Sequence, residues 1–260
     1  VAGRAKKMCL LLAAHAYHRN YRWVIGANRD EFYARPSAPA APWGNHSGML
    51  GGRDLEGNGT WLAVNKAGAF AAITNVRMPP SIAAPRSRGL IVNDYLTGAL
   101  SAREFVDSLG DSSHEYAGFN VLASDATSLI WYSNQLERPK TLDPGVYGLS
   151  NHFLDTPWPK VTRIKADFHQ AENFTETDLI EALFTSLANE QCAPDKELPN
   201  TGVSLAYERA LAPIFIAGDN YGTRCSTIVL ISNTDELTFI ERRFGPNKSF
   251  LGESVLRFEI

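Results

Sequence analysis

The chain lacks the features that would place it in a membrane, on nucleic acid or in a disulfide-rich class. No apolar run approaches the roughly 20 residues that a helix needs to cross a bilayer. The 25 Lys and Arg residues are outnumbered by 28 Asp and Glu, so there is no basic excess for nucleic acid or an anionic membrane surface. Only three cysteines occur, at wide spacing, which indicates neither a disulfide framework nor a zinc site. We predict a cytoplasmic protein with no membrane span, nucleic-acid partner or metal.

The composition is that of a globular protein with a sizeable core. Of 260 residues, 44% are apolar and 20% charged. We see no repeat, low-complexity tract or linker, so we predict one domain over residues 9–260. Residues 1–8 are interpreted as an N-terminal extension or leader, because the segment before Met8 is basic and Met8-Cys9 is a more natural beginning than Val1. Such a segment arises from start-site choice, or is removed so that Cys9 becomes terminal.

Hydrophobic patterning predicts strands and helices in blocks. Helices are expected at 87–100, 101–109, 160–170 and 177–187, the second of them with the capping-box pattern of Ser101 and Glu104. Strands are expected at 9–17, 21–27 and 146–151, with hairpins over 60–75, 119–133 and 226–243. This order favours an α+β fold in which helices cover two packed antiparallel sheets.

Other segments carry weaker signals. Residues 35–52 are rich in Pro, Ala and Gly, and we expect a long irregular loop that carries Trp43 and forms one wall of a pocket. His15 and His18 are expected on a wet face or in a turn. No regular element is predicted over 194–218, and a loose end is predicted after Gly245-Pro246.

The tetrapeptide Asn28-Arg29-Asp30-Glu31 ends an apolar, β-prone run that begins at Trp23. Four polar side chains at this point indicate that a strand leaves the sheet there, where folds often carry binding and catalytic residues. A solvated turn with a surface Arg–Glu pair is the alternative.

With Met8-Cys9 and the segments that follow, the tetrapeptide resembles the NRDE family, also called the family of transport and Golgi organisation protein 2. The order of short motifs along the whole chain carries this resemblance, and none of them would suffice alone. They are Arg35-Pro36, Trp43-Gly44, Gly59-Thr60-Trp61-Leu62, Thr74-Asn75, Arg86 to Gly89, Gly118-Phe119-Asn120, Tyr147-Gly148-Leu149-Ser150-Asn151, Thr156-Pro157-Trp158 and Tyr221-Gly222-Thr223-Arg224.

Polar residues at the ends of separate strands give a second resemblance. Their order resembles that of the matching residues in the N-terminal nucleophile (Ntn) hydrolases of the choloylglycine hydrolase and penicillin V acylase branch. The residues are Cys9, at the start of the first strand, and Asp30, Asn75, Asn151 and Arg224. The resemblance implies a four-layer αββα sandwich of two antiparallel sheets. The chain departs from the Arg-Asn-x-Asp pattern of these hydrolases, because it has Ala27 in place of the arginine.

This resemblance implies a cysteine hydrolase, or an acyl-transfer enzyme, for an amide or thioester. A terminal Cys9 would be both nucleophile and base, because an α-amine has a pKa near 8. Asp30 would hold the amine and Arg224 would favour the thiolate. Asn75 and Asn151 would donate to the oxyanion, and no cofactor is needed for catalysis.

Members of the family are linked to haem and acyl-coenzyme A, which implies a second possibility, a non-catalytic binding and trafficking protein on a hydrolase fold. In that case Cys9 is a haem ligand, or Arg29 contacts a coenzyme phosphate. We assign ligand binding to Asn28, Arg29, Glu31, Trp43 and His152. The partner in either case is a small molecule, an acyl compound or haem.

Overall fold

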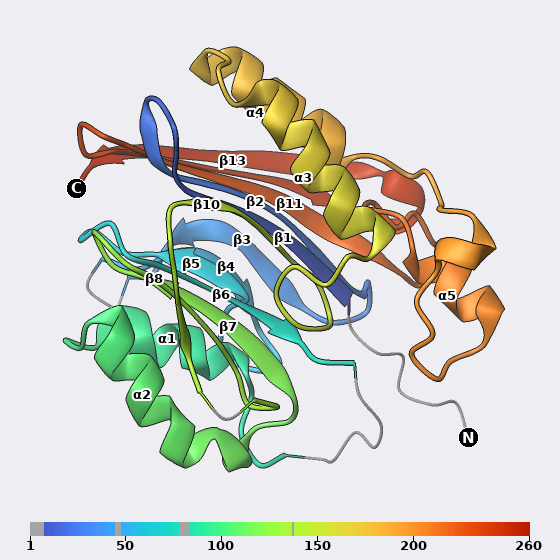
Figure 1. The fold of residues 1–260 in the computed structure, drawn as a ribbon, viewed down its shortest axis with the longest axis horizontal. Helices are drawn as coiled ribbons and strands as arrows, with labels where there is room; N and C mark the ends of the chain where they lie inside the picture. Colours follow the sequence, from blue (N-terminus) through green and yellow to red (C-terminus); the bar gives the residue numbers. More distant parts are fainter. Residues whose placement is uncertain (1–7, 45–47, 78–83, 137) are drawn as a thin grey trace.

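The computed structural model describes residues 8–44, 48–77, 84–136 and 138–260, and it confirms the four-layer arrangement (Figure 1). The expected extension lies outside the described residues apart from Met8. Every pair of neighbouring strands in both sheets is antiparallel. The six-stranded sheet has the order β10 (Gly145–Leu149), β1 (Met8–His18), β2 (Tyr21–Phe32), β11 (Tyr221–Ser232), β12 (Glu236–Phe244), β13 (Phe250–Glu259). The seven-stranded sheet has the order β3 (Ser37–Pro42), β4 (Leu50–Asp54), β5 (Leu62–Val64), β6 (Phe70–Asn75), β7 (Phe119–Ser124), β8 (Leu129–Ser133), β9 (Lys140–Leu142).

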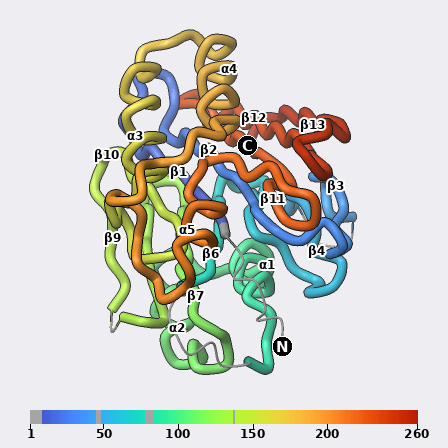
Figure 2. Tube along the Cα trace, turned by 90° about the vertical axis from the view of Figure 1, so that its right-hand side faces the viewer, coloured from blue at the N-terminus to red at the C-terminus, as the bar shows by residue number. Residues whose placement is uncertain are grey.

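Helices cover the outer face of each sheet. The six-stranded sheet is covered by α3 (Pro159–Ala171) and α4 (Glu176–Leu187), and the seven-stranded sheet by α1 (Gly89–Thr97) and α2 (Ala102–Ser112) (Figure 1). Ser101 and Glu104 form the expected capping box at the start of α2. A fifth helix, α5 (Leu205–Leu211), lies in front of the end of the sheets where β1 begins (Figure 2).

Three hydrophobic clusters fill the spaces between the four layers of helices and sheets, because both faces of each sheet are covered. Along β1, Leu10 and Leu12 pack against α3 and α4, whereas Leu11 and Ala13 pack between the sheets. This two-sided burial explains why β1 reads as one apolar run without alternation. The third hydrophobic cluster lies between the seven-stranded sheet and the helices α1 and α2.

Four sequence interpretations are wrong. The tetrapeptide 28–31 does not leave the sheet, because β2 continues to Phe32. Residues 35–52 are not one irregular loop, since they contain β3 and the start of β4. Residues 194–218 contain α5, and the end of the chain forms β13, not a loose end. Long-range pairing, which local patterning does not report, orders the proline-rich β3 and the charged β13.

His15 and His18 are also buried, at 9% and 4% exposure, although a wet face or a turn was expected. The ring of His15 stacks on Trp23 with 4.3 Å between centroids, and the ring of His18 lies 5.0 Å from that of Tyr21. Burial lowers the pKa of both rings, so neutral imidazole behaves here as an aromatic packing group.

Candidate functional site

The site is built around the main chain of Cys9, near the start of β1 and between β10 and β2. The main-chain N–H of Cys9 donates to Oδ1 of Asn151 at 3.1 Å, and its carbonyl oxygen accepts from Ser150 Oγ at 2.9 Å. The residues that follow β10 therefore fix the nitrogen that would be the α-amine of a chain beginning at Cys9. Cys9 as a whole residue is partly exposed, and its thiol forms no disulfide.

Asn151 is itself held rigidly, with its side chain fully buried. Its Nδ2 donates to the carbonyl oxygen of Asn75 at 2.9 Å, and its own carbonyl oxygen accepts from the N–H of Arg77 at 2.7 Å. Thr74 Oγ1 donates to Ser150 O at 2.8 Å in the same place. These bonds tie the end of β6 in one sheet to the end of β10 in the other. Asn151 thus positions Cys9, while the carboxamide of Asn75 has no hydrogen-bond partner among the described residues and is partly exposed.

Asp30 lies opposite Met8 in the register of β1 and β2, one residue from Cys9. Its Oδ1 accepts from Thr223 Oγ1 at 2.7 Å, and its Oδ2 is buried with no partner in the described part of the chain. Burial raises the pKa of Asp30 to about 6, although the charge of Lys160 and the Thr223 hydrogen bond oppose this shift. The unpartnered oxygen is an acceptor available to a nearby ammonium group.

The thiol of Cys9 is held in its neutral form. Burial raises its pKa to about 12, and the negative charge of Asp30 adds to this effect. The charge of Arg29 and a hydrogen bond from the main chain of Asp30 oppose it. With a peptide bond on its nitrogen, Cys9 therefore has almost no thiolate at neutral pH, and a base must take its proton before it can act as a nucleophile.

Lys160 is a buried cation that the sequence analysis missed. It lies in the first turn of α3, is 3% exposed, and its Nζ donates to Leu211 O at 3.0 Å. Burial lowers the pKa of Lys160 to about 8, and Asp30 is the charge that most strongly opposes this shift. A lysine beside prolines at a helix start gives no functional signal. Only its position after the Thr156-Pro157-Trp158 motif could have suggested it.

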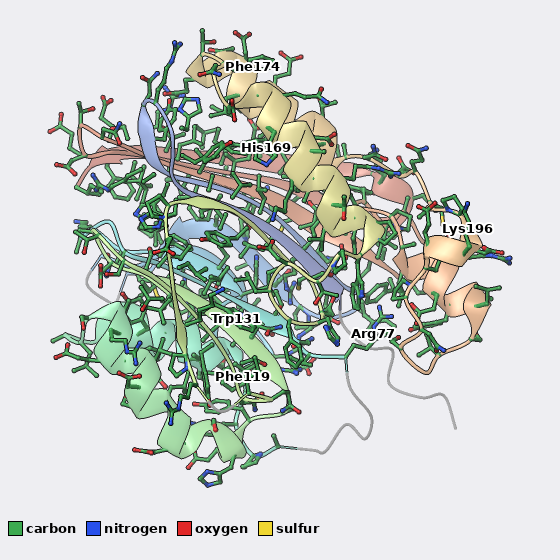
Figure 3. The ribbon with its side chains drawn as sticks, viewed as in Figure 1. Arg77, Phe119, Trp131, His169, Phe174 and Lys196 are labelled. Carbon is green, nitrogen blue, oxygen red and sulfur yellow. The ribbon has the colours of Figure 1, made fainter. Side chains whose placement is uncertain are left out.

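Two arginines interact electrostatically with these residues, Arg77 with Lys160 and Arg88 with Cys9. Arg77, labelled in Figure 3 near the end of β6, forms a 2.8 Å ion pair with Glu208 of α5, and both side chains are almost fully buried. Arg88 donates to Gly118 O at 2.9 Å and interacts electrostatically with the Cys9 thiol and Glu31, while burial lowers its pKa. Arg88 is therefore a cation on the thiol side of the site. It lay within a family motif but had been given no role.

The structure does not bring two predicted residues to the thiol. The Nδ2 of Asn28 donates to Leu187 O and to Ile214 O, both at 2.8 Å, on the helix-covered face of the sheet. Arg224 lies near the start of β11, not at its end, and its guanidinium donates to the carbonyl oxygens of Phe32 at 2.8 Å and Arg35 at 2.9 Å. Both side chains fasten segments of main chain that surround the site.

The predicted ligand-binding residues are also dispersed. Arg29 lies opposite Cys9 in the register, 3.3 Å from Asp54 and over the ring of Trp61 at 4.3 Å. Glu31 is buried, 3.9 Å from Arg29. Trp43 donates to Gly51 O at 3.0 Å within the core layer below the seven-stranded sheet. The ring of His152 is 2.9 Å from Thr156 Oγ1. Among the described residues no group of three or more His, Cys, Asp or Glu is arranged to hold a metal ion.

The fold is that of the Ntn-hydrolase class. Similar solved structures are a mutant conjugated bile acid hydrolase from Clostridium perfringens, with TM-score 0.54 and 10% identity over 97% of this chain and 92% of that chain, and the Caenorhabditis elegans ortholog of N-acylethanolamine-hydrolyzing acid amidase, with TM-score 0.50 and 12% identity over 85% and 92%. At such identities the likeness concerns the fold alone.

Sequence comparison defines the family more closely. Residues 8–246 match the family described as Transport and Golgi organisation 2. The Transport and Golgi organization 2 homolog of Mus musculus is 34% identical over 92% of this chain and 90% of the relative, and the Homo sapiens homolog is 35% identical over 85% and 86%. The chain belongs to the Transport and Golgi organisation 2 family, which confirms the resemblance seen in the sequence. No helix in the described ranges is long and apolar enough to cross a membrane.

Proposed function

We propose that this protein is a cytoplasmic cysteine hydrolase or acyl-transfer enzyme of the Ntn type, acting on an amide or thioester of an apolar acyl group. One observation carries the proposal. The main-chain nitrogen of Cys9 is fixed by Asn151, and Asp30, which lies opposite the preceding Met8 in the strand register, has a buried carboxylate oxygen without a partner among the described residues. A chain beginning at Cys9 would have an ammonium group at this position, and the unused oxygen of Asp30 is a suitable acceptor for it.

In the proposed reaction the α-amine of Cys9 takes the proton of the thiol. The thiolate attacks the carbonyl carbon of the substrate, and the carboxamide of Asn75 donates to the oxyanion. The α-ammonium then gives its proton to the leaving amine or thiol, and the acyl group remains on the sulfur as a thioester. Water, deprotonated by the same amine, releases the carboxylic acid and restores the thiol.

Asp30 and Lys160 set the charge of the amine's surroundings. The carboxylate form of Asp30 stabilises the ammonium, which matters because the unassisted thiol has a pKa raised to about 12. Lys160 opposes the burial effect on Asp30 and so favours its ionised form at neutral pH. Arg88, which interacts with the thiol, would stabilise the thiolate in place of Arg224.

The second candidate is a non-catalytic carrier of haem or acyl-coenzyme A. A neutral thiol is a poor haem ligand, because it is the thiolate that binds iron, so the raised pKa of Cys9 favours the acyl compound. Acyl-coenzyme A is a thioester, and it is therefore a ligand for the carrier and a substrate for the enzyme. The two candidates differ in turnover, not in the compound that binds.

The test compares two forms of the protein, one released from a fusion cut directly before Cys9 and one that keeps the preceding residues. Palmitoyl-coenzyme A and an N-palmitoyl amide are the probes. The hydrolase proposal expects acid release only from the chain that begins at Cys9, and expects its loss in Cys9→Ala. Saturable binding without release by either form would favour the carrier and overturn the enzyme. Mass spectrometry of the protein from its native source then shows whether the chain begins at Cys9.

A further inference from the structure

The four strands at the edges of the two sheets differ in how they are protected. Strand β3 carries Pro39 and Pro42, which cannot donate to a neighbouring strand, and β9 and β10 have only three and five residues. Strand β13 has ten residues, contains no proline, and pairs on one side with β12. Within the described ranges no strand pairs with its other side. A long edge of this kind is a template for pairing with another chain.

Three apolar side chains of β13 are exposed to solvent. Phe250, Leu251 and Val255 are 61%, 58% and 52% exposed. From Glu253 to Glu259 the strand pairs with β12 without a register shift, so its outer main-chain groups are regularly spaced. The register shift in this pairing lies between Phe250 and Gly252, before this stretch, and Gly252 has a φ of +136°.

The sequence of β13 is complementary to itself in one antiparallel register. We propose that β13 pairs with β13 of a second copy of this chain, about a two-fold axis at Val255. This pairing places Glu253 of each copy opposite Arg257 of the other, so two opposite-charge pairs flank a central Val–Val contact. It would join the two six-stranded sheets into one continuous sheet.

Neighbouring registers are less favourable. Moving the axis to Leu256 places Glu253 opposite Glu259, and moving it to Arg257 places that arginine opposite its own copy. An axis at Glu253 brings the two copies of this carboxylate together. An axis midway between two residues would place side chains that point to opposite faces of the sheet opposite one another, and the pleat excludes such pairing. An axis at Ser254 avoids like charges but forms no opposite-charge pair between the copies.

The charges on β13 already have partners within the chain, and these are weak. Glu253 is 2.6 Å from Arg242, and Arg257 is 2.9 Å from Glu176, in pairs whose side chains are all at least one-third exposed. Exposed ion pairs contribute little, so exchanging or sharing these partners costs little. The same two residues are therefore available to the second copy.

Analytical ultracentrifugation over a range of micromolar concentrations tests the proposal. The wild-type chain should dimerise, and Arg257→Glu, which faces Glu253 of the second copy, should weaken the dimer about tenfold. The charge-swapped double variant Glu253→Arg with Arg257→Glu restores the complementary pattern and should recover most of this loss. A monomeric wild type, or a double variant that dimerises no better than Arg257→Glu, would overturn the proposal. Equal melting temperatures exclude misfolding as the cause.

Cross-linking tests the register. In a Cys192→Ser background, which removes an exposed thiol, Val255→Cys should form a disulfide-linked dimer on mild oxidation, because residue 255 faces its own copy. Ser254→Cys is the matched control, since residue 254 faces residue 256 and should cross-link far more slowly. Equal cross-linking of the two variants would contradict the axis at Val255. Both variants keep the residues around Cys9 unchanged, so the result is independent of the proposed hydrolase.

Discussion

The main-chain nitrogen of Cys9 lies 3.1 Å from Oδ1 of Asn151, although the two residues are 142 positions apart in the chain. This hydrogen bond joins the start of β1 to the turn after β10, and Asn151 is anchored in turn to the end of β6 by its bond to Asn75 O. The carboxamide of the asparagine predicted to stabilise an oxyanion is therefore hydrogen-bonded, in this structure, to the main chain of Cys9 and of Asn75.

Asn75 and Asn151 should respond differently to alanine. Asn151→Ala leaves the N–H of Cys9 and the carbonyl of Asn75 without their partner, and should lower the free energy of unfolding by about 2 kcal/mol or more. Asn75→Ala removes a side chain without a described partner, and should change that free energy by less than about 0.5 kcal/mol. It should instead lower kcat by about 10²-fold or more, since it removes the oxyanion donor. Urea unfolding and steady-state rates measure both, and an unchanged kcat in Asn75→Ala would exclude this donor.

Asn28 provides a control variant that should lose folding stability but keep its kcat. Its carboxamide donates to Leu187 O and Ile214 O and accepts from Ser226 Oγ, all on the face of the sheet away from the Cys9 side chain. Asn28→Ala should therefore lower the free energy of unfolding by about 2–4 kcal/mol. The kcat of the folded fraction should stay close to wild type. A large loss of kcat at full folding would show that Asn28 acts in the reaction.

Asp30 should leave a signature in the pH dependence of stability. Its pKa in the folded protein is raised from 3.8 to about 6, so the folded state binds this proton more tightly than the unfolded state. Protonation of Asp30 therefore contributes its full stabilisation below about pH 4, and this stabilisation is lost as pH rises through about 6. The free energy of unfolding should fall by about 3 kcal/mol over this range. Asp30→Asn should abolish this slope in urea unfolding between pH 4 and 6, and an unchanged slope would assign it to another group.

Lys160 should shift the acid limb of activity. In the proposed enzyme the carboxylate of Asp30 would hold the amine, so kcat/KM should rise with an apparent pKa of about 6. Lys160→Met removes the cation that lowers the pKa of Asp30 and should move this limb to higher pH. Lys165→Met is the matched control on the same helix, because Lys165 pairs with the partly exposed Asp155 at 2.7 Å. A limb that moves equally in both variants would count against the specific role of Lys160.

Much of the fold could be predicted because local patterns agree with it. The hairpins at 60–75 and 119–133, the α2 cap and the apolar stripe of α4 all have short-range causes. Strand β13 could not be predicted in this way, since its order comes from pairing with β12. The extension of β2 to Phe32 was missed for the same reason, as β11 pairs with it through the polar tetrapeptide.

The site was predicted in part. The order of Cys9, Asp30, Asn75 and Asn151 along the chain was sufficient to propose a convergence. In the structure Asn151 accepts a hydrogen bond from Cys9, and Asp30 lies opposite Met8 in the strand register. Residue type alone could not reveal that Arg224 holds main-chain carbonyls, nor that Lys160 is buried, because both depend on which helix or loop packs against the sheet. The roles of these residues in a reaction stay predictions.

The most direct test of the central claim is the intact mass of the chain that begins at Cys9 after a brief reaction with palmitoyl-coenzyme A and an acid quench. The account predicts one palmitoyl group on Cys9, absent from Cys9→Ala and from the chain in which a peptide bond occupies the Cys9 nitrogen. An acyl group on the exposed Cys192 alone, or equal acylation of Cys9 with and without the preceding residues, would contradict the role of the free α-amine.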